Sequence, residues 1–167
     1  MKKFIVLIML VLPLGMGAQE VKIAVVNQMD VFNAMPEIAT LESELATMRK
    51  QYENEFKLLT DDYDKKMGDY IAQQDSLPEN IRMMRMQEIE GIRTRAENFQ
   101  QMASQEIEKK YQDLITPIQE KLQKAIDAVG EENGYSYIIN NNPQILLYVS
   151  KSATDATDKV KAKLGIK

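Results

Sequence analysis

The 167-residue sequence contains no cysteine, no histidine and no tryptophan. Without cysteine the chain has no disulfide, no thiolate nucleophile, no cysteine-based zinc site and no residue for lipoprotein-type lipid attachment. Without histidine as well, an enzyme would need a carboxylate pair, a lysine or a hydroxyl nucleophile in a concave pocket. No glycine-rich phosphate loop is present. We therefore expect no catalytic residue, no metal, no cofactor and no small-molecule substrate.

Proline and glycine are scarce in the middle of the chain. From Pro36 to Gln74 there is no internal proline and one glycine, Gly68. Apolar residues recur there every three or four positions, which is typical of an amphipathic helix. The same spacing resumes at Ile81 and ends near Asn133-Gly134, a typical left-handed helix stop. With a turn at Asp75–Pro78, residues 36–132 are predicted to form a long antiparallel helical hairpin, the arm.

The two flanks are β-rich. Three short segments, Val21–Asn27, Tyr135–Ile139 and Ile145–Val149, are predicted strands. Asp155 is expected to cap a final helix that runs to about Leu164. The predicted fold class is α+β, mainly α: residues 19–35 and 133–167 form a small three-stranded β body from which the arm projects. A body of this size is small for a private core, and its strands leave open edges, so we expect a homo-oligomer.

The N-terminus has the layout of a secretory signal peptide. Lys2 and Lys3 precede an apolar run, Phe4–Leu14, and the small-residue cluster Gly15–Ala18. We predict that residues 1–18 are a signal peptide, cleaved before Gln19. A membrane anchor is the weaker interpretation, because a span needs roughly 20 apolar residues.

The chain without this segment is mildly acidic. Removing Lys2 and Lys3 from the 21 basic residues leaves 19 against 25 acidic ones, a net charge of −6. Phosphate backbones bind to basic surfaces. Nucleic acid is therefore not an expected partner.

Methionines gather near the predicted tip of the hairpin. They are Met67, Met83, Met84 and Met86. Flexible thioether side chains adapt to varied apolar partners, which makes these residues candidates for contact with an unfolded protein. The alternative, which we favour on general grounds, is that they pack the two helices together.

An aromatic stripe follows one face of the first long helix. It consists of Tyr52, Phe56, Tyr63 and Tyr70. A binding face is one interpretation, but such a stripe is more often the seam between two helices, and we predict the seam here.

Two clusters of charge each allow a binding interpretation and a structural one. Asp61, Asp62 and Asp64 allow a calcium-site interpretation, but Lys65 and the offset of Gly68 do not fit an EF-hand loop, so a solvated helical face is predicted. The basic tail could make a weak contact with an anionic membrane surface, or it could complement the dipole of the last helix, which we favour. Its members are Lys159, Lys161, Lys163 and Lys167.

Three short motifs carry a family resemblance. Lys22–Asn27 followed by Val31-Phe32, then Tyr137–Asn140, and last Asp155-Ala156-Thr157 resemble the opening and closing patterns of the Skp/OmpH family of periplasmic chaperones. The order of strand, hairpin, two strands and helix covers the whole chain after the signal segment. The best-known members are strongly basic, whereas the stretch from Leu41 to Leu114 carries 16 acidic and 11 basic residues.

The resemblance implies both an architecture and a function. It implies a homotrimer whose strands build a small barrel-like body and whose three arms enclose a cavity, like a jellyfish. It also implies a periplasmic, ATP-independent holdase that binds unfolded outer-membrane proteins and prevents their aggregation. The strand residues expected to associate are Ile23, Val25, Ile138, Ile139, Leu146 and Leu147. The alternative function is an exported coiled-coil adaptor of the cell envelope, with an enzyme a distant third.

Overall fold

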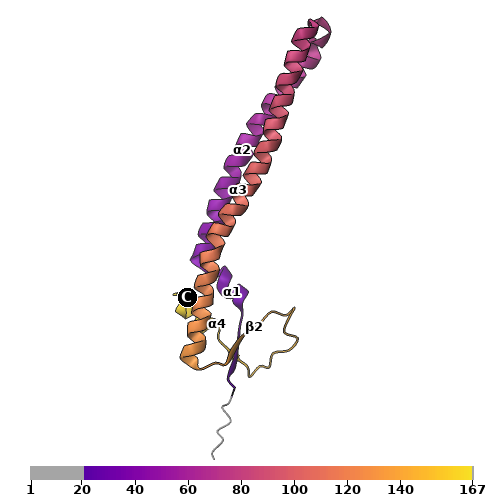
Figure 1. Cartoon of the computed structure of the whole chain (residues 1–167). Coiled ribbons are helices and arrows are strands. Elements are labelled where there is room, and N and C mark those ends of the chain that lie inside the picture. The colour runs from indigo at the N-terminus through magenta and orange to yellow at the C-terminus, as the bar shows by residue number, and fades with distance from the viewer. Residues whose placement is uncertain (1–20, 167) are drawn as a thin grey trace, which may run out of the picture.

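The structure, a computed structural model, describes residues 21–166 and consists of a long helical arm on a small body (Figure 1). The predicted signal peptide, with its cleavage point, lies outside the described residues, as does Lys167. In chain order the strands and α-helices are β1 (Ile23–Val26), α1 (Gln28–Asn33), α2 (Pro36–Gln73), α3 (Glu79–Asn133), β2 (Tyr137–Asn140), β3 (Thr154–Asp155) and α4 (Thr157–Lys163).

The arm is the predicted hairpin. Helices α2 and α3 run side by side and are joined by a 3-10 turn over Gln74–Ser76 (Figure 1). At 1.5 Å per residue, the 38 residues of α2 extend about 57 Å and the 55 residues of α3 about 83 Å. Because α3 is longer, its C-terminal turns continue past the start of α2 into the body.

Proline and glycine define the ends of these helices. Pro36 lies in the first turn of α2, where its missing N–H would have had no helical acceptor. Gly134 ends α3 with a φ of 65°, in the left-handed region. The Tyr135 N–H then donates to the Gly130 carbonyl at 3.0 Å and the Gly134 N–H to the Glu131 carbonyl at 3.2 Å. The predicted stop at Asn133-Gly134 is therefore confirmed.

The seam of the arm pairs large side chains on α2 with smaller ones on α3. After Leu45, α2 has no fully buried residue within the described chain, whereas α3 buries Ile89, Ile92, Ala96 and Ala103. The α2 side of the seam is half-buried throughout and consists of Met48, Tyr52, Phe56, Leu59, Tyr63, Met67 and Tyr70. The aromatic stripe therefore belongs to the seam, as predicted.

The body is built around a three-stranded parallel sheet of order β2-β1-β3. Ile23 lies opposite Tyr137 and Val25 opposite Ile139, so these four residues share one face. Ala24 and Val26 point to the other face and join the hydrophobic core, where Ile138 packs against them. The arm is thus the connection between the two paired strands β1 and β2.

The third strand is not where the sequence predicted it. Residues 145–149 form no strand, and the predicted strand residue Leu147 is 96% exposed. The strand that pairs with β1 on the side opposite β2 is Thr154–Asp155. The apolar, β-branched composition of Ile145–Val149 suggested a strand, but composition does not specify which segment pairs with β1. Within this chain, the second edge of β1 is occupied by Thr154–Asp155 instead.

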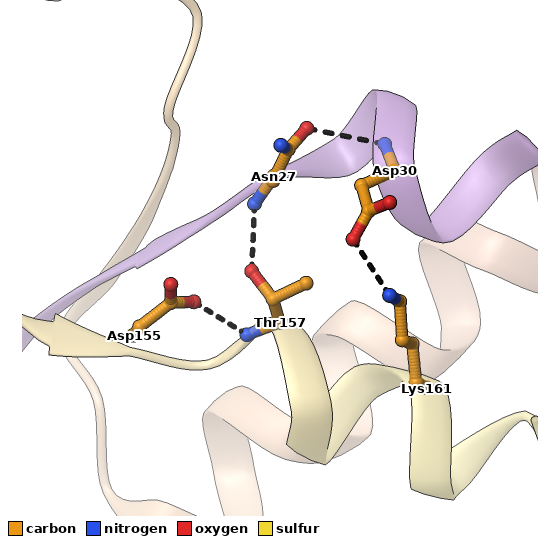
Figure 2. A network of polar contacts seen from close by, with 5 residues as sticks. All are labelled: Asn27, Asp30, Asp155, Thr157 and Lys161. Atoms are coloured by element: carbon orange, nitrogen blue, oxygen red, sulfur yellow. Dashed lines mark hydrogen bonds and ion pairs between the residues drawn. The ribbon is translucent and has the colours of Figure 1, made fainter. Parts of the chain in front are cut away.

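A polar network closes the body around the end of β1 (Figure 2). The Asn27 N–H donates to Thr157 Oγ1 at 2.9 Å, and the Asn27 side chain accepts from the Asp30 N–H at 3.1 Å. Lys161 Nζ reaches Asp30 Oδ2 at 2.6 Å. Asp155 accepts from the Thr157 N–H at 2.8 Å, but α4 has Ala156 at its cap position. The predicted N-cap at Asp155 is therefore wrong by one residue, although its carboxylate still satisfies the first helical N–H.

One hydrophobic core joins the body to the base of the arm. It contains Val31 of α1, Leu41 and Leu45 of α2, Leu122 and Val129 of α3, together with side chains of β1 and α4. The buried residues nearer the tip, such as Ile92, are not part of it. Side chains at the base are therefore buried by several elements, whereas side chains farther along the arm are buried by α2 and α3 alone.

Candidate functional site

Two shallow grooves lie between the helices of the arm. The groove at the base has a volume of about 330 Å³, and the one farther along the arm about 280 Å³. Leu41, Leu114, Pro117 and Ile118 give the base groove an apolar floor. Both grooves are open on one side, so they suit a chain passing over the surface better than a substrate enclosed from water.

A single ion pair forms the polar edge of the base groove. Lys121 Nζ donates to Glu37 Oε1, and this hydrogen bond lowers the pKa of Glu37 below its ordinary value. The two charges neutralise each other. The groove therefore offers an apolar contact rather than a catalytic pair.

Aromatic side chains line the groove farther along the arm. The rings of Tyr52 and Phe99 meet edge to face with centroids 5.8 Å apart. Tyr52 also donates its hydroxyl to Glu106, a hydrogen bond that raises the pKa of the phenol. These contacts cross from α2 to α3, so the aromatic residues hold the helices together and also line the groove.

The four predicted tip methionines separate into two environments. Met67 is half-buried in the seam, where it packs the helices together. Met83 and Met84 are 65% and 64% exposed and Met86 is 39% exposed. Ile71 on α2 is also exposed at this end of the arm. The packing interpretation therefore fits Met67, and the other three methionines are available to a partner.

Polar contacts tie the helices together next to these exposed methionines. Lys66 of α2 pairs with Glu88 of α3 at 2.5 Å, and this hydrogen bond lowers the pKa of Glu88. Arg85 Nη1 lies 3.4 Å from the side-chain oxygen of Gln73. Polar contacts therefore hold the two helices together at the tip, and the thioethers of Met83, Met84 and Met86 take no part in these contacts.

The outer face of the sheet is a second apolar surface. Ile23, Tyr137 and Ile139 are 49%, 63% and 39% exposed, and Val25 lies buried among them. Next along the chain, Ile145, Leu147 and Tyr148 are more exposed still. Of the residues predicted to associate, Ile138 points to the inner core and Leu146 is half-buried on the irregular segment.

The lysines of the C-terminal helix have partners within the body. Lys159 donates to Asn133 and Tyr135 and lies over the Tyr135 ring, while Lys163 pairs with Glu132. Lys161 pairs with Asp30, and that hydrogen bond raises the pKa of the lysine. These contacts occupy the ammonium groups at the end of α4, which weakens the interpretation of the tail as a lipid contact.

The carboxylates at Asp61, Asp62 and Asp64 lie on an exposed helical face. Lys57 pairs with Asp61 one turn away at 2.7 Å. Among residues 21–166, no cluster of three or more carboxylate, histidine or cysteine side chains is placed to hold a metal ion. Likewise, none of the described helices is both long enough and apolar enough to cross a bilayer.

Sequence reasoning missed two features of the body. The polar network of Figure 2 joins Asn27 to Thr157, 130 residues apart, and no local pattern indicates such a contact. The sequence also did not predict which face of the sheet is exposed. Alternation along β1 and β2 shows that the sheet has two faces but not which one the helices cover.

Comparisons with known proteins place this architecture in a family. No curated protein matches the chain. A crystal structure from Caulobacter crescentus, described there as a candidate outer membrane chaperone (OmpH-like), matches with a TM-score of 0.74 and 14% identity over 86% of this chain and 83% of that one. The family profile described as outer membrane protein (OmpH-like) matches residues 22–164. The chain therefore belongs to the OmpH-like family of outer membrane proteins.

Proposed function

We propose that this protein is a periplasmic, ATP-independent holdase that binds unfolded outer-membrane β-barrel proteins and prevents their aggregation. The observation that carries the proposal is the arm: two helices project from the body (Figure 1). Isolated apolar side chains are exposed on these helices among charged ones. Membership of the OmpH-like family and the likeness to the Caulobacter structure support it.

The physical task of a holdase matches this surface. Unfolded β-barrel proteins have amphipathic strands that pair edge to edge when they meet. Many weak apolar contacts can hold such a chain in an exchanging state without a source of chemical energy. Leu58, Ile71, Met83, Met84 and Met102 provide separated contacts of this kind along the arm, each 44% exposed or more.

We also propose that the body assembles as a homotrimer. Parallel sheets are normally covered on both faces, but here the helices cover one face and leave Ile23, Tyr137 and Ile139 exposed on the other. The outer edge of β2 is free within the described chain, and the segment Ile145–Val149, which follows β2 in the sequence, has exposed apolar residues. Pairing of that segment with a neighbouring copy would give it the strand conformation that its composition favours.

A trimer joined through the body would direct its arms to the same side. The arms, whose surface combines sparse exposed apolar side chains with an excess of acidic over basic residues, would then surround a space. A client held there is kept from other unfolded chains. The adaptor alternative predicts one stable partner rather than many clients in crosslinking from cells.

The test is protection of a client on dilution from urea. Protein lacking residues 1–18, at micromolar concentration and without ATP, should keep an unfolded outer-membrane β-barrel protein in solution as a complex of defined mass in light scattering. Substituting Met83, Met84 and Met86 together by lysine should weaken protection, because it replaces apolar contacts by charge.

Met29→Lys is the matched control, since Met29 is 66% exposed but belongs to α1 in the body. It should protect as well as the parent chain. Precipitation of several different β-barrel clients in the presence of the parent protein would overturn the proposal and favour the adaptor.

A further inference from the structure

The methionines of this protein differ widely in their exposure to solvent. Sulfur occurs here as methionine alone, because the chain has 11 methionines and no cysteine. Met35 is buried in the core at 1% exposure, and Met48 and Met67 are half-buried. Three of the exposed methionines, Met83, Met84 and Met86, lie within four consecutive positions near the start of α3.

These three thioethers can change chemically without disturbing the fold. They lie outside the hydrophobic core, and the helices at the tip are held by Lys66–Glu88 and Arg85–Gln73 contacts that do not involve sulfur. Methionine has high helix propensity, but its exposed side chain contributes little to stability. A modification at this position therefore changes the surface that the tip presents and leaves the hairpin in place.

We propose that Met83, Met84 and Met86 form an oxidation-sensitive site that tunes client binding by the arm tip. The proposal rests on the proposed holdase function and adds a regulation to it. A peroxide is the oxidant: its O–O bond breaks, one oxygen atom forms a sulfoxide with the thioether sulfur, and the other leaves as water or alcohol. The sulfur loses two electrons and the peroxide gains them.

The consequence for binding follows from polarity. A sulfoxide is polar and strongly hydrated, whereas a thioether is apolar and adapts to varied partners. Three sulfoxides on one turn of helix replace exposed apolar surface at the tip by polar surface. Client segments lose contact there. Methionine sulfoxide reductases restore the contact with a dithiol as reductant: the dithiol gives two electrons and two protons and becomes a disulfide, and the sulfoxide oxygen leaves as water.

The first experiment maps oxidation on the folded, mature chain. Hydrogen peroxide is added, and peptides are analysed by mass spectrometry at increasing times. Met83 and Met84 should oxidise at least about tenfold faster than Met35, because oxidation follows access of the oxidant to sulfur. Met29, with 66% exposure, reports the rate of an exposed methionine in the body. Equal rates for the tip methionines and Met35 would overturn the proposal.

The second experiment compares client protection before and after peroxide for each protein. The parent chain and Met29→Leu should both lose protection severalfold and regain it after treatment with methionine sulfoxide reductases. The variant with leucine at positions 83, 84 and 86 should show no further change on peroxide treatment, measured against its own untreated sample.

Failures of the two proposals are distinguishable. If the untreated parent chain gives no protection, the holdase function falls and the effect of oxidation on binding falls with it. If the untreated chain protects and protection survives full oxidation at the tip, the holdase function stands and the oxidation-sensitive site is overturned. An equal loss of protection in the triple leucine variant also overturns it.

Discussion

Ile92 in the arm and Leu122 at its base are almost equally buried, with 0% and 2% exposure, but their surroundings differ. Leu122 belongs to a core that collects side chains from β1, α1, α2, α3 and α4. Ile92 lies in a seam between two helices, outside that core. Two equally buried side chains can therefore differ in how many elements of the fold they hold together. We therefore expect the body and the base of the arm to unfold as one unit, and the distal arm to open at a lower free energy.

The largest expected effect concerns the outer face of the body sheet. Replacing Tyr137 and Ile139 together by lysine places charge on the apolar face that we propose to be covered by other copies. The mass from light scattering should fall from trimer to monomer, while circular dichroism retains the helical signal of the arm. Leu58→Lys, an equally exposed change on α2, should leave the mass unaltered. A double variant that remains trimeric would contradict this use of the sheet face.

The comparison of Leu122 with Ile92 can be tested directly by truncation. Leu122→Ala should lower the free energy of unfolding by about 2–5 kcal/mol, because it leaves a cavity in the shared core. Ile92→Ala should shift the urea midpoint less and should speed hydrogen exchange mainly in the distal arm. Equal losses of global stability in both variants would show that arm and body unfold as one unit.

The polar network of the body has a hydroxyl that can be removed almost isosterically. Thr157→Val leaves the Asn27 N–H without its acceptor in a largely buried position, and it should cost about 1–3 kcal/mol in urea unfolding. Thr157→Ser retains the acceptor and should recover most of the loss. If valine is tolerated as well as serine, water replaces the lost contact.

Substitution by alanine at two different glycines should change the free energy of unfolding in opposite directions. Gly134→Ala forces a side chain into the left-handed region at the end of α3 and should destabilise the protein by about 1 kcal/mol. Gly68→Ala lies inside α2 with open space around the new Cβ, so it should stabilise the helix by about 0.5–1 kcal/mol. Thermal unfolding of both variants measures whether each one is more or less stable than the parent chain. A Gly134→Ala variant that is more stable would contradict the observed cap.

The smallest effect is the pH dependence of the ion pair at the base. The pKa of Glu37 is lowered from 4.5, mainly by its hydrogen bond with Lys121, so its contribution is present above that pH and is lost as the pH falls through the folded pKa. The pair is partly exposed, which limits the contribution to at most about 0.5 kcal/mol. The difference in urea midpoint between the parent chain and Glu37→Gln should therefore shrink between pH 6 and roughly pH 3. A constant difference would show that the pair is fully screened.

Local chemistry predicted the arm well. Apolar spacing of three and four residues, Pro36, the turn before Pro78 and the Asn133-Gly134 stop all act within a few residues of the positions they define. Both long helices therefore begin and end close to the predicted positions. The seam also followed from the pattern, because the aromatic residues of α2 have no other apolar surface to pack against.

The body could be predicted only in outline, because its contacts join distant parts of the chain. Ile145–Val149 has the composition of a strand but no free edge of β1, whereas Thr154–Asp155 is too short to show a pattern and still pairs. The exposed tip methionines were predicted as a group, but their environments differ because Met67 lies on the seam side of α2 and Met83 does not lie on that side of α3. Sequence spacing cannot supply that orientation until the partner helix is placed.

The position of β1 at the centre of the sheet determines when in synthesis its pairing partners become available. Its two neighbours are residues 137–140 and 154–155, so every backbone pairing of β1 within the sheet uses residues made after the arm is complete. During synthesis the first strand remains unpaired while both arm helices follow it. A chain that stopped at Asn133 would contain the entire arm but neither of the two strands that pair with β1.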